Sequence, residues 1–240
     1  MSTFFISDLH LCPSRPEINA QFFRFLAGPA RAAQALYILG DLFEYWAGDD
    51  DADDPFNQAV AQGLHQLADS GVAMHFMAGN RDFLLGDRYA RRAGLHLLND
   101  PALIDLEGTP TLLMHGDTLC TDDVSYQRFR EQVRTPAWQQ DFLALPLAAR
   151  KAQIEDLRRK SEIEKSAKTM EIMDVNQHAV VATLSAHACT RLIHGHTHRP
   201  GQHLLEVDGR RCERWVLADW YTSGSYIACD ANGCRAVTLG

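Results

Sequence analysis

The sequence predicts an α/β fold, in which buried strands alternate with helices along the chain. Five short apolar runs have the composition of strands, and a polar or glycine-containing turn follows each of them. These runs span residues 3–7, 35–39, 72–77, 111–114 and 191–193. Apolar residues at positions 56, 60, 64 and 67, after Pro55 and before Gly71, have the spacing of an amphipathic helix. Because functional loops gather at the carboxyl ends of such strands, we expect functional residues in the turns after these runs.

The middle of the chain has a different pattern, which predicts a helical insertion. Residues 122–177 hold no strand signal and show helical periodicity. After them the pattern returns to strands, with Asp208-Gly209 and Asn232-Gly233 as hairpin turns. We therefore expect residues 1–240 to form a single domain that carries a helical insertion, or lid, at about 122–177.

Composition and charge narrow the classes of function. The chain has 240 residues, of which 46% are hydrophobic and 22% charged, as in ordinary globular proteins. Its net charge of −8 argues against binding to duplex DNA through many phosphates, so we expect no nucleic acid partner. The sequence has neither a basic secretory leader nor an apolar run of membrane-spanning length, and we expect a cytoplasmic protein. An acidic protein that handles phosphates needs another source of positive charge, and a metal ion is the obvious one.

The cysteines are scattered and contain no C-x-x-C pair. They are Cys12, Cys120, Cys189, Cys212, Cys229 and Cys234. A chain of this size folds without covalent cross-links, so we expect all six to be reduced thiols.

Polar motifs follow all five predicted strands, and together they indicate a metal centre. They read DLH at residues 8–10, GD at 40–41, GNRD at 79–82, HGD at 115–117 and GHTH at 195–198. Each motif alone is weak, because a Gly-Asp pair is usually only a turn and many H-x-H pairs are solvated. In combination they offer carboxylate, amide and imidazole donors without cysteine, a set that suits Mn, Fe or Zn. An aspartate is short enough to bridge two cations about 3.5–4 Å apart.

This order of motifs resembles that of the calcineurin-like metallophosphoesterases. The resemblance implies an αββα sandwich of two sheets with the motifs at the strand ends. It also implies that one metal ion binds Asp8, His10, Asp41 and His198. The second ion would bind Asp41, Asn80, His115 and His196, with Asp41 as the bridge. His194 is not a ligand in that scheme, and we expect it to support the ligands or to pack.

One residue departs from the family pattern, which usually has histidine after the asparagine of the third motif. Here that position is Arg81, which cannot donate a proton but can hold phosphate oxygens and stabilise the charge of a transition state. A phosphate leaving group needs no general acid, so Arg81 favours pyrophosphate cleavage over the hydrolysis of alkyl phosphates. We expect the nucleophile to be a hydroxide that bridges the metal ions.

The segments DLHLCPSRP, GDLFEYWAGDD, GNRDFLLG and HGDTLCTDD resemble the pyrophosphohydrolases of lipid A biosynthesis. That resemblance implies two Mn²⁺ ions and cleavage of UDP-2,3-diacylglucosamine to UMP and 2,3-diacylglucosamine 1-phosphate (lipid X). It also implies peripheral association with the cytoplasmic face of the inner membrane. The positions that would contact this lipid-linked UDP-sugar are Asn80, Arg81, Asp123, Ser161, Lys165, Lys168 and His196.

Several alternatives stay open. The aromatic and aliphatic residues of the insertion are suited to holding acyl chains, but they also suit the insertion's own core. The basic run from Arg150 to Lys168 is either a solvated face or a surface for lipid headgroups or substrate phosphates. Other functions are a phosphoesterase of the same fold that acts on dinucleoside polyphosphates or nucleic acid ends, and a binding module without catalysis. No obligatory protein partner is evident.

Overall fold

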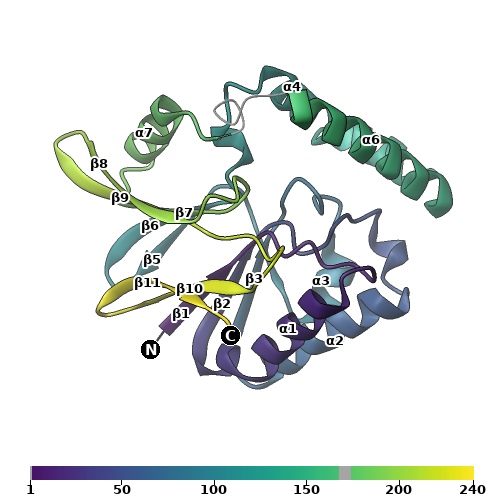
Figure 1. The fold of residues 1–240 in the computed structure, drawn as a ribbon, viewed down its shortest axis with the longest axis horizontal. Helices are drawn as coiled ribbons and strands as arrows, with labels where there is room; N and C mark the ends of the chain where they lie inside the picture. The colour runs from purple at the N-terminus through teal and green to yellow at the C-terminus, as the bar shows by residue number, and fades with distance from the viewer. Residues whose placement is uncertain (1, 168–173) are drawn as a thin grey trace.

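The computed structural model describes residues 2–167 and 174–240, with side chains for 2–161 and 174–240. Two mixed β-sheets form its centre (Figure 1). The first has the order β11 (Gly233–Thr238), β10 (Ser225–Asp230), β1 (Ser2–Ile6), β2 (Ala33–Leu39), β3 (Ala73–Met77) and β4 (His96–Leu98). The second has the order β5 (Ala102–Leu106), β6 (Thr109–Met114), β7 (Arg191–His194), β9 (Arg210–Val216) and β8 (Gly201–Val207).

Helices cover the outer face of each sheet (Figure 1). The first sheet packs on α1 (Pro16–Ala27), α2 (Pro55–Asp69) and α3 (Asp87–Ala93), and the second on α7 (Gln177–Ala186). Short 3₁₀ turns lie at Pro29–Ala32, Asp49–Asp51 and Asp117–Leu119. The layers are helix, sheet, sheet and helix, so the αββα arrangement expected from the resemblance is confirmed.

The strict alternation of side chains along the strands explains why two sheets stack in this way. In β1, Phe4 and Ile6 contact the helices α1 and α2, whereas Phe5 points to the other sheet. In β6, Leu112 and Met114 pack under α7, whereas Leu113 faces the first sheet. Strands that are apolar on both faces must be covered on both sides, which explains the near-continuous apolar runs in the sequence.

The five predicted strands and the predicted helix are confirmed as β1, β2, β3, β6, β7 and α2. Both hairpin turns are confirmed as well. Asp208-Gly209 joins β8 to β9 with positive φ at both residues, and Asn232-Gly233 lies at the turn between β10 and β11. The strands β4 and β5 were not predicted, because they are short edge strands with several exposed side chains.

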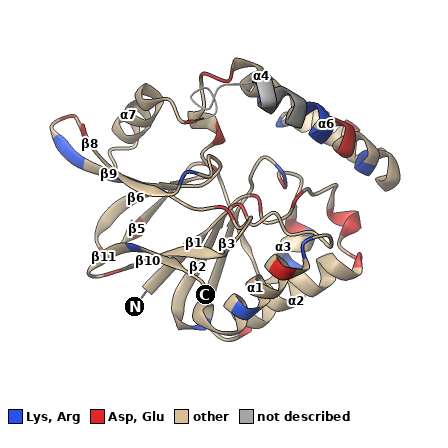
Figure 2. Cartoon of the chain, viewed as in Figure 1, with Lys and Arg blue, Asp and Glu red and all other residues tan. Residues whose placement is uncertain are grey.

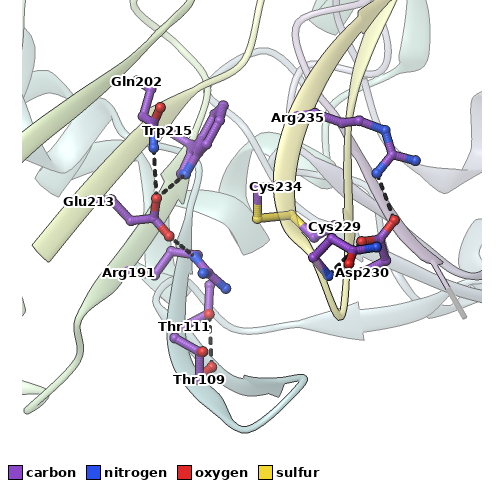
Figure 3. Close-up of a disulfide and its surroundings, with 11 residues drawn as sticks. Thr109, Thr111, Arg191, Gln202, Glu213, Trp215, Cys229, Asp230, Cys234 and Arg235 are labelled. Atoms are coloured by element: carbon purple, nitrogen blue, oxygen red, sulfur yellow. Dashed lines mark hydrogen bonds and ion pairs between the residues drawn. A yellow bond between two sulfur atoms is a disulfide. The ribbon is translucent and has the colours of Figure 1, made fainter.

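The expectation of six reduced thiols is wrong for one pair. Cys229 of β10 and Cys234 of β11 lie directly opposite each other in the hairpin and form a disulfide (Figure 3). Their spacing in the sequence matches no familiar motif, and the hairpin register alone brings the two sulfurs together. Cys12, Cys120, Cys189 and Cys212 are free.

The helices α4 (Val124–Val133), α5 (Pro136–Leu143) and α6 (Leu147–Ala167) lie between β6 and β7 in the chain. Basic and acidic residues alternate along the described part of α6, which Figure 2 shows as blue and red segments. Several of its basic residues pair with acidic ones, including Arg150 with Asp50 and Lys151 with Asp51 at 2.7 Å. Arg150 is only 2% exposed, so this part of the basic run anchors the helix to the core and is not a solvated face.

The large apolar residues of the insertion and of the loops that carry the motifs divide between two environments. Phe43, Trp46 and Phe142 are buried in the core. Large apolar side chains of the helices α4 to α6 and their connections also remain exposed, namely Val124, Phe129, Leu143, Leu145 and Leu157. Among the described residues, no helix has the length and apolar character needed to cross a membrane.

Mutation of a residue buried between the two sheets tests whether the sheets pack against each other as described. Leu113 is fully buried there, so Leu113→Ala removes apolar contacts and leaves a cavity. We expect the free energy of unfolding to fall by about 2–5 kcal/mol in urea denaturation. Leu204→Ala on β8 is the matched control, because Leu204 is 80% exposed and its loss should change stability by less than about 0.5 kcal/mol. Equal effects of the two changes would contradict this packing.

Candidate metal centre

All five motifs converge at one edge of the two sheets. Asp8 follows β1, Asp41 follows β2, and Asn80 follows β3, each two or three residues beyond the end of its strand. His115 directly follows β6, and His196 lies two residues beyond β7. Because β1, β2 and β3 are parallel, and β6 and β7 are parallel, their carboxyl ends bring these side chains together.

The backbone at this centre is unusual. Five of the expected ligands have positive φ: Asp8, His10, Asp41, His196 and His198. This region costs energy for residues other than glycine, and it clusters at functional sites where the surroundings hold it in place.

Two glycines allow the loops to approach closely. A Cβ on Gly79 would lie 2.2 Å from Asp41 Oδ1, and one on Gly195 would lie 2.3 Å from Asp8 Oδ2. Any side chain at either position would displace a carboxylate of the centre. Glycine is therefore required at these positions of the third and fifth motifs, because there is no room for a Cβ atom.

The first group of side chains contains Asp8, His10, Asp41 and His198. His10 Nε2 lies 3.5 Å from His198 Nε2 and 4.0 Å from Asp41 Oδ2. His198 Nε2 lies 3.4 Å from Asp8 Oδ1. The ring nitrogens and carboxylate oxygens thus face the same small volume.

The second group contains Asn80, His115 and His196, and Asp41 joins it to the first. Asn80 Oδ1 lies 3.0 Å from His115 Nε2 and 2.9 Å from His196 Nδ1. His115 Nε2 lies 3.9 Å from Asp41 Oδ1, whereas the other oxygen of Asp41 faces His10. The two oxygens of Asp41 therefore point towards different groups, as a bridging ligand requires.

The chemistry of these residues fits divalent cations. Asp8, His10 and His198 form one set with metal-ligand spacing, and Asp8, Asp41 and His115 form another. Asp8 Oδ1 and His10 Nδ1 are buried and have no hydrogen-bond partner among the described residues. Buried polar atoms are costly unless they are paired, so an oxygen left in this state at the centre of a donor set is suited to a cation.

Neighbouring groups orient the imidazoles. His115 Nδ1 lies 2.9 Å from the carbonyl of Leu39, to which it donates, so Nε2 is the nitrogen that can bind a metal ion once it has lost its proton. His198 Nδ1 lies 3.6 Å from Asp219 Oδ2, and His10 Nδ1 lies 3.7 Å from Glu44 Oε2. Both separations are slightly longer than a hydrogen bond, so these carboxylates are neighbours of the Nδ1 atoms and not acceptors in this structure.

Burial and charge shift the pKa values in this centre. Burial raises the pKa of Asp41 to about 7, and the carboxylates of Asp82 and Asp8 add to this effect. Burial alone would lower the pKa of His115, but Asp41, Asp117 and Asp8 together raise it to about 9. The metal-free centre therefore retains a proton at neutral pH.

His194 lies beside the centre but does not contribute a free donor to it. Its Nδ1 lies 2.9 Å from the carbonyl of Gly195, and its Nε2 lies 3.1 Å from Arg214 NH1, which donates to it. Burial and the charge of Arg214 lower the pKa of His194 to about 4, so the ring is neutral at physiological pH. This arrangement agrees with the expected supporting role.

The residues expected to contact substrate lie on both sides of the centre. Asn80 and His196 are within the second group, and Arg81 donates its backbone N–H to Asp41 Oδ1 at 2.8 Å. Asp123 caps the first turn of α4, where it accepts from the backbone of Tyr126 at 3.1 Å, and Ser161 is exposed on α6.

The two expected lysine contacts are not described at the side-chain level. Lys165 lies within the helical range of α6, but its side chain is outside the described residues. Lys168 itself lies outside the described residues. The structure thus brings Asn80, Arg81 and His196 together and leaves the two lysines as sequence predictions.

Three acidic residues of the centre were not singled out from the sequence: Glu44, Asp82 and Asp219. Asp82 was visible as the last residue of the third motif, but its role was not. Glu44 and Asp219 lie in the segments GDLFEYW and ADWYTS, where aromatic neighbours were the more obvious feature. The only sequence feature that could have indicated Glu44 is its position three residues after the expected ligand Asp41.

Comparisons with known proteins agree with this geometry. A family model described as calcineurin-like phosphoesterase matches residues 1–200. The UDP-2,3-diacylglucosamine hydrolase of Aromatoleum aromaticum is 58% identical over 233 residues, covering 97% of this chain and 95% of the relative. The same-named protein of Stenotrophomonas maltophilia (strain K279a) is 54% identical over 246 residues, covering 100% and 99%. That of Edwardsiella ictaluri is 52% identical over 240 residues, covering 100% and 92%.

Fold, site and family model define a metal-dependent phosphoesterase of the calcineurin-like class. Within that class, the chain belongs to the family of UDP-2,3-diacylglucosamine hydrolases, which it matches over essentially its whole length. The resemblance stated from the motifs is therefore confirmed. Family and donor sets together imply a divalent metal site.

The raised pKa of His115 predicts how metal binding depends on pH. A ligand nitrogen must lose its proton to bind a metal ion, so below about pH 9 protons compete with the cation at His115. The affinity for Mn²⁺ should therefore fall as the pH falls, by up to about tenfold per pH unit. Titration calorimetry at pH 7.0 and 8.0, in buffers of different ionisation enthalpy, measures both the affinity and the proton release. Equal affinity at the two pH values, without proton release, would show that the centre is already deprotonated.

Proposed function

We propose that this chain hydrolyses the pyrophosphate bond of UDP-2,3-diacylglucosamine to give UMP and 2,3-diacylglucosamine 1-phosphate, a step of lipid A biosynthesis. The curated relatives carry the name of this activity at 51–58% identity across the chain. The observation that carries the proposal is the joint presence of a paired donor set and Arg81. The donor set is suited to two cations, and Arg81 is suited to a phosphate leaving group.

The residues that hold the metal ions are Asp8, His10, Asp41, Asn80, His115, His196 and His198. We assign Asp8, His10, Asp41 and His198 to one ion and Asp41, Asn80, His115 and His196 to the other. The support is the grouping of their donor atoms and the opposed directions of the Asp41 oxygens. Two Mn²⁺ ions held by these residues would supply Lewis acidity to phosphoryl oxygens and would lower the pKa of a bound water.

The chain itself orients the substrate around that centre. Arg81 is the group that stabilises the charge of the transition state, because its backbone is fixed to Asp41 and its side chain is only 17% exposed. Asn80 and His196 belong to the second donor group and are placed to contact a bound phosphate as well. Since the departing sugar phosphate is a weak base, no side chain has to protonate it.

The helices α4, α5 and α6 act as a lid for the lipid part of the substrate. Their exposed apolar side chains, including Phe129, Leu143 and Leu157, suit two acyl chains, with about 0.8 kcal/mol for each buried CH₂ group. Asp123, Ser161, Lys165 and Lys168 contact the polar part of the glucosamine lipid.

The lipid substrate also favours peripheral association with the cytoplasmic face of the inner membrane. An enzyme whose substrate carries two acyl chains must extract it from a bilayer or act at the bilayer surface. A lid with exposed apolar residues and basic side chains provides both types of contact with an anionic membrane.

The direct test is hydrolysis of purified UDP-2,3-diacylglucosamine in the presence of Mn²⁺, with EDTA as the control. We expect UMP and lipid X as products, and loss of activity after chelation that added Mn²⁺ restores. Phosphodiesterase activity on dinucleoside polyphosphates or nucleic acid ends, without activity on the lipid nucleotide, would favour the alternative phosphoesterase. Metal binding without any hydrolysis would favour a binding module.

Isotope labelling shows which of the two phosphorus atoms of the substrate is attacked by water. We expect water to attack the phosphorus next to uridine, so that the sugar-side phosphate leaves. Hydrolysis in ¹⁸O-water should then place one ¹⁸O atom in UMP and none in lipid X, as measured by mass spectrometry. Label in lipid X would reverse the assignment of nucleophile and leaving group.

The lid and the metal centre should be separable by mutation. Loss of one charge-assisted contact costs about 1.5–3 kcal/mol, so Lys168→Ala should lower kcat/KM for the lipid nucleotide by about 10- to 150-fold. Hydrolysis of a small activated phosphodiester should change little, because that substrate does not reach the lid. His115→Ala is the matched control, and it should depress both reactions together. If Lys168→Ala impairs both substrates equally, the insertion belongs to the catalytic core and not to a lid.

A further inference from the structure

Glu44 is an acidic residue that the proposed reaction does not use, although it lies inside the metal centre. It follows Asp41 by three residues in the loop after β2. Its backbone N–H donates to the carbonyl of Leu11 at 3.1 Å, which ties this loop to the loop after β1. Its side chain is 12% exposed.

Three positively charged or proton-donating groups surround the carboxylate of Glu44. Arg158, from the lid helix α6, donates to Oε1. Arg81 NH1 lies 3.7 Å from the same oxygen, and His10 Nδ1 lies 3.7 Å from Oε2. These three partners come from the lid, from the proposed phosphate-binding loop and from the proposed ligand set of one metal ion.

The contact with His10 is the most informative one. His10 is buried, and its Nδ1 has no hydrogen-bond partner among the described residues. A histidine that binds a metal ion through Nε2 normally donates its Nδ1 proton to a carboxylate or carbonyl. Glu44 Oε2 lies only slightly beyond hydrogen-bond distance, so a small rotation of either side chain completes the bond.

An ordinary surface ion pair does not account for this arrangement. Exposed ion pairs contribute little, because water and salt screen them. The side chains of Glu44, Arg81 and Arg158 are only 12%, 17% and 29% exposed, and two guanidinium groups share one carboxylate. Removal of that carboxylate would leave two neighbouring cations without their shared counter-charge and His10 without an acceptor.

We propose that Glu44 is a positioning residue that orients His10 for metal binding and holds Arg81 and the lid helix α6 in place beside the centre. The proposal rests on the assignment of His10 as a metal ligand made above. Oε2 of Glu44 orients the ring of His10. Oε1 of Glu44 holds the side chains of Arg81 and of Arg158, and Arg158 belongs to the lid helix α6.

The test compares Glu44→Ala and Glu44→Gln with Asp51→Asn. Asp51→Asn is the matched control, because Asp51 pairs with Lys151 at 2.7 Å and so also joins α6 to the core. Asp51 has no contact with the ligand set among the interactions of the described residues. The first readout is Mn²⁺ affinity without substrate, measured by calorimetry. The second is amide hydrogen exchange in residues 154–161 of α6.

We expect Glu44→Ala to weaken Mn²⁺ binding by about 10- to 100-fold, and Asp51→Asn to change it by less than about twofold. Glu44→Gln keeps a neutral acceptor for His10 Nδ1, so it should recover affinity to within about fivefold of wild type. The amide group no longer neutralises Arg81 and Arg158, so exchange in α6 should still be about tenfold faster and kcat/KM on a small phosphodiester about tenfold lower.

Wild-type Mn²⁺ affinity in Glu44→Ala, or a loss no larger than in Asp51→Asn, would overturn the role of Glu44. If Glu44→Ala does not fold, Glu44→Gln decides: wild-type exchange in α6 together with wild-type kcat/KM overturns the proposal. Metal affinity and exchange are read without substrate, so a wrong substrate assignment leaves both unaffected. A wrong role for Glu44, by contrast, leaves the wild-type hydrolysis of the lipid nucleotide intact.

Discussion

The buried carboxylate of Asp82 joins two strand-end loops, and the geometry of the metal centre depends on that junction. Its oxygens accept backbone hydrogen bonds from Gly79 at 2.8 Å and from Leu42 at 2.7 Å, and Asp41 N lies 3.3 Å away. These bonds hold the loop after β3 against the loop after β2, where Asn80 and Asp41 lie. Positive-φ conformations at the ligands persist only when their surroundings impose them, and a fully buried acceptor of several N–H groups is such a surrounding.

Contacts near both ends of the segment attach the helices that follow β6 to the same centre. At one end, Asp117 accepts from Tyr126 Oη at 2.6 Å and from Arg130 Nε at 2.7 Å, which fastens α4 to the loop that carries His115. The Tyr126 ring also stacks on His196 at 5.9 Å. At the other end, Arg158 of α6 reaches Glu44 beside His10. The contacts at the two ends touch opposite groups of the donor set, so the position of these helices and the geometry of the centre constrain each other.

Charge explains why an acidic protein handles an anionic substrate here. The centre concentrates carboxylates, and burial, together with repulsion from Asp82 and Asp8, raises the pKa of Asp41. Divalent cations would remove that repulsion and present positive charge to phosphate oxygens. Arginines at the rim, Arg81 and Arg158, are themselves held by Glu44, so the positive charge of the rim has a fixed location.

Those features of the protein that depend on local pattern could be predicted from the order of its residues. Apolar runs predicted the five strands that precede the motifs, and the motifs indicated the expected donor residues and identified the family. The edge strands β4 and β5 were not predicted, because strands with several exposed side chains do not need a continuous apolar run in the sequence.

Tertiary structure alone decided which distant residues meet. The β10–β11 register paired Cys229 with Cys234, and the loop packing placed Glu44 beside His10 and Asp219 beside His198. The same packing turned part of the basic run of α6 into buried anchors such as Arg150. The reason is physical: hydrophobic periodicity depends on near neighbours in the chain, whereas the partner of a buried charge is set by how the elements pack.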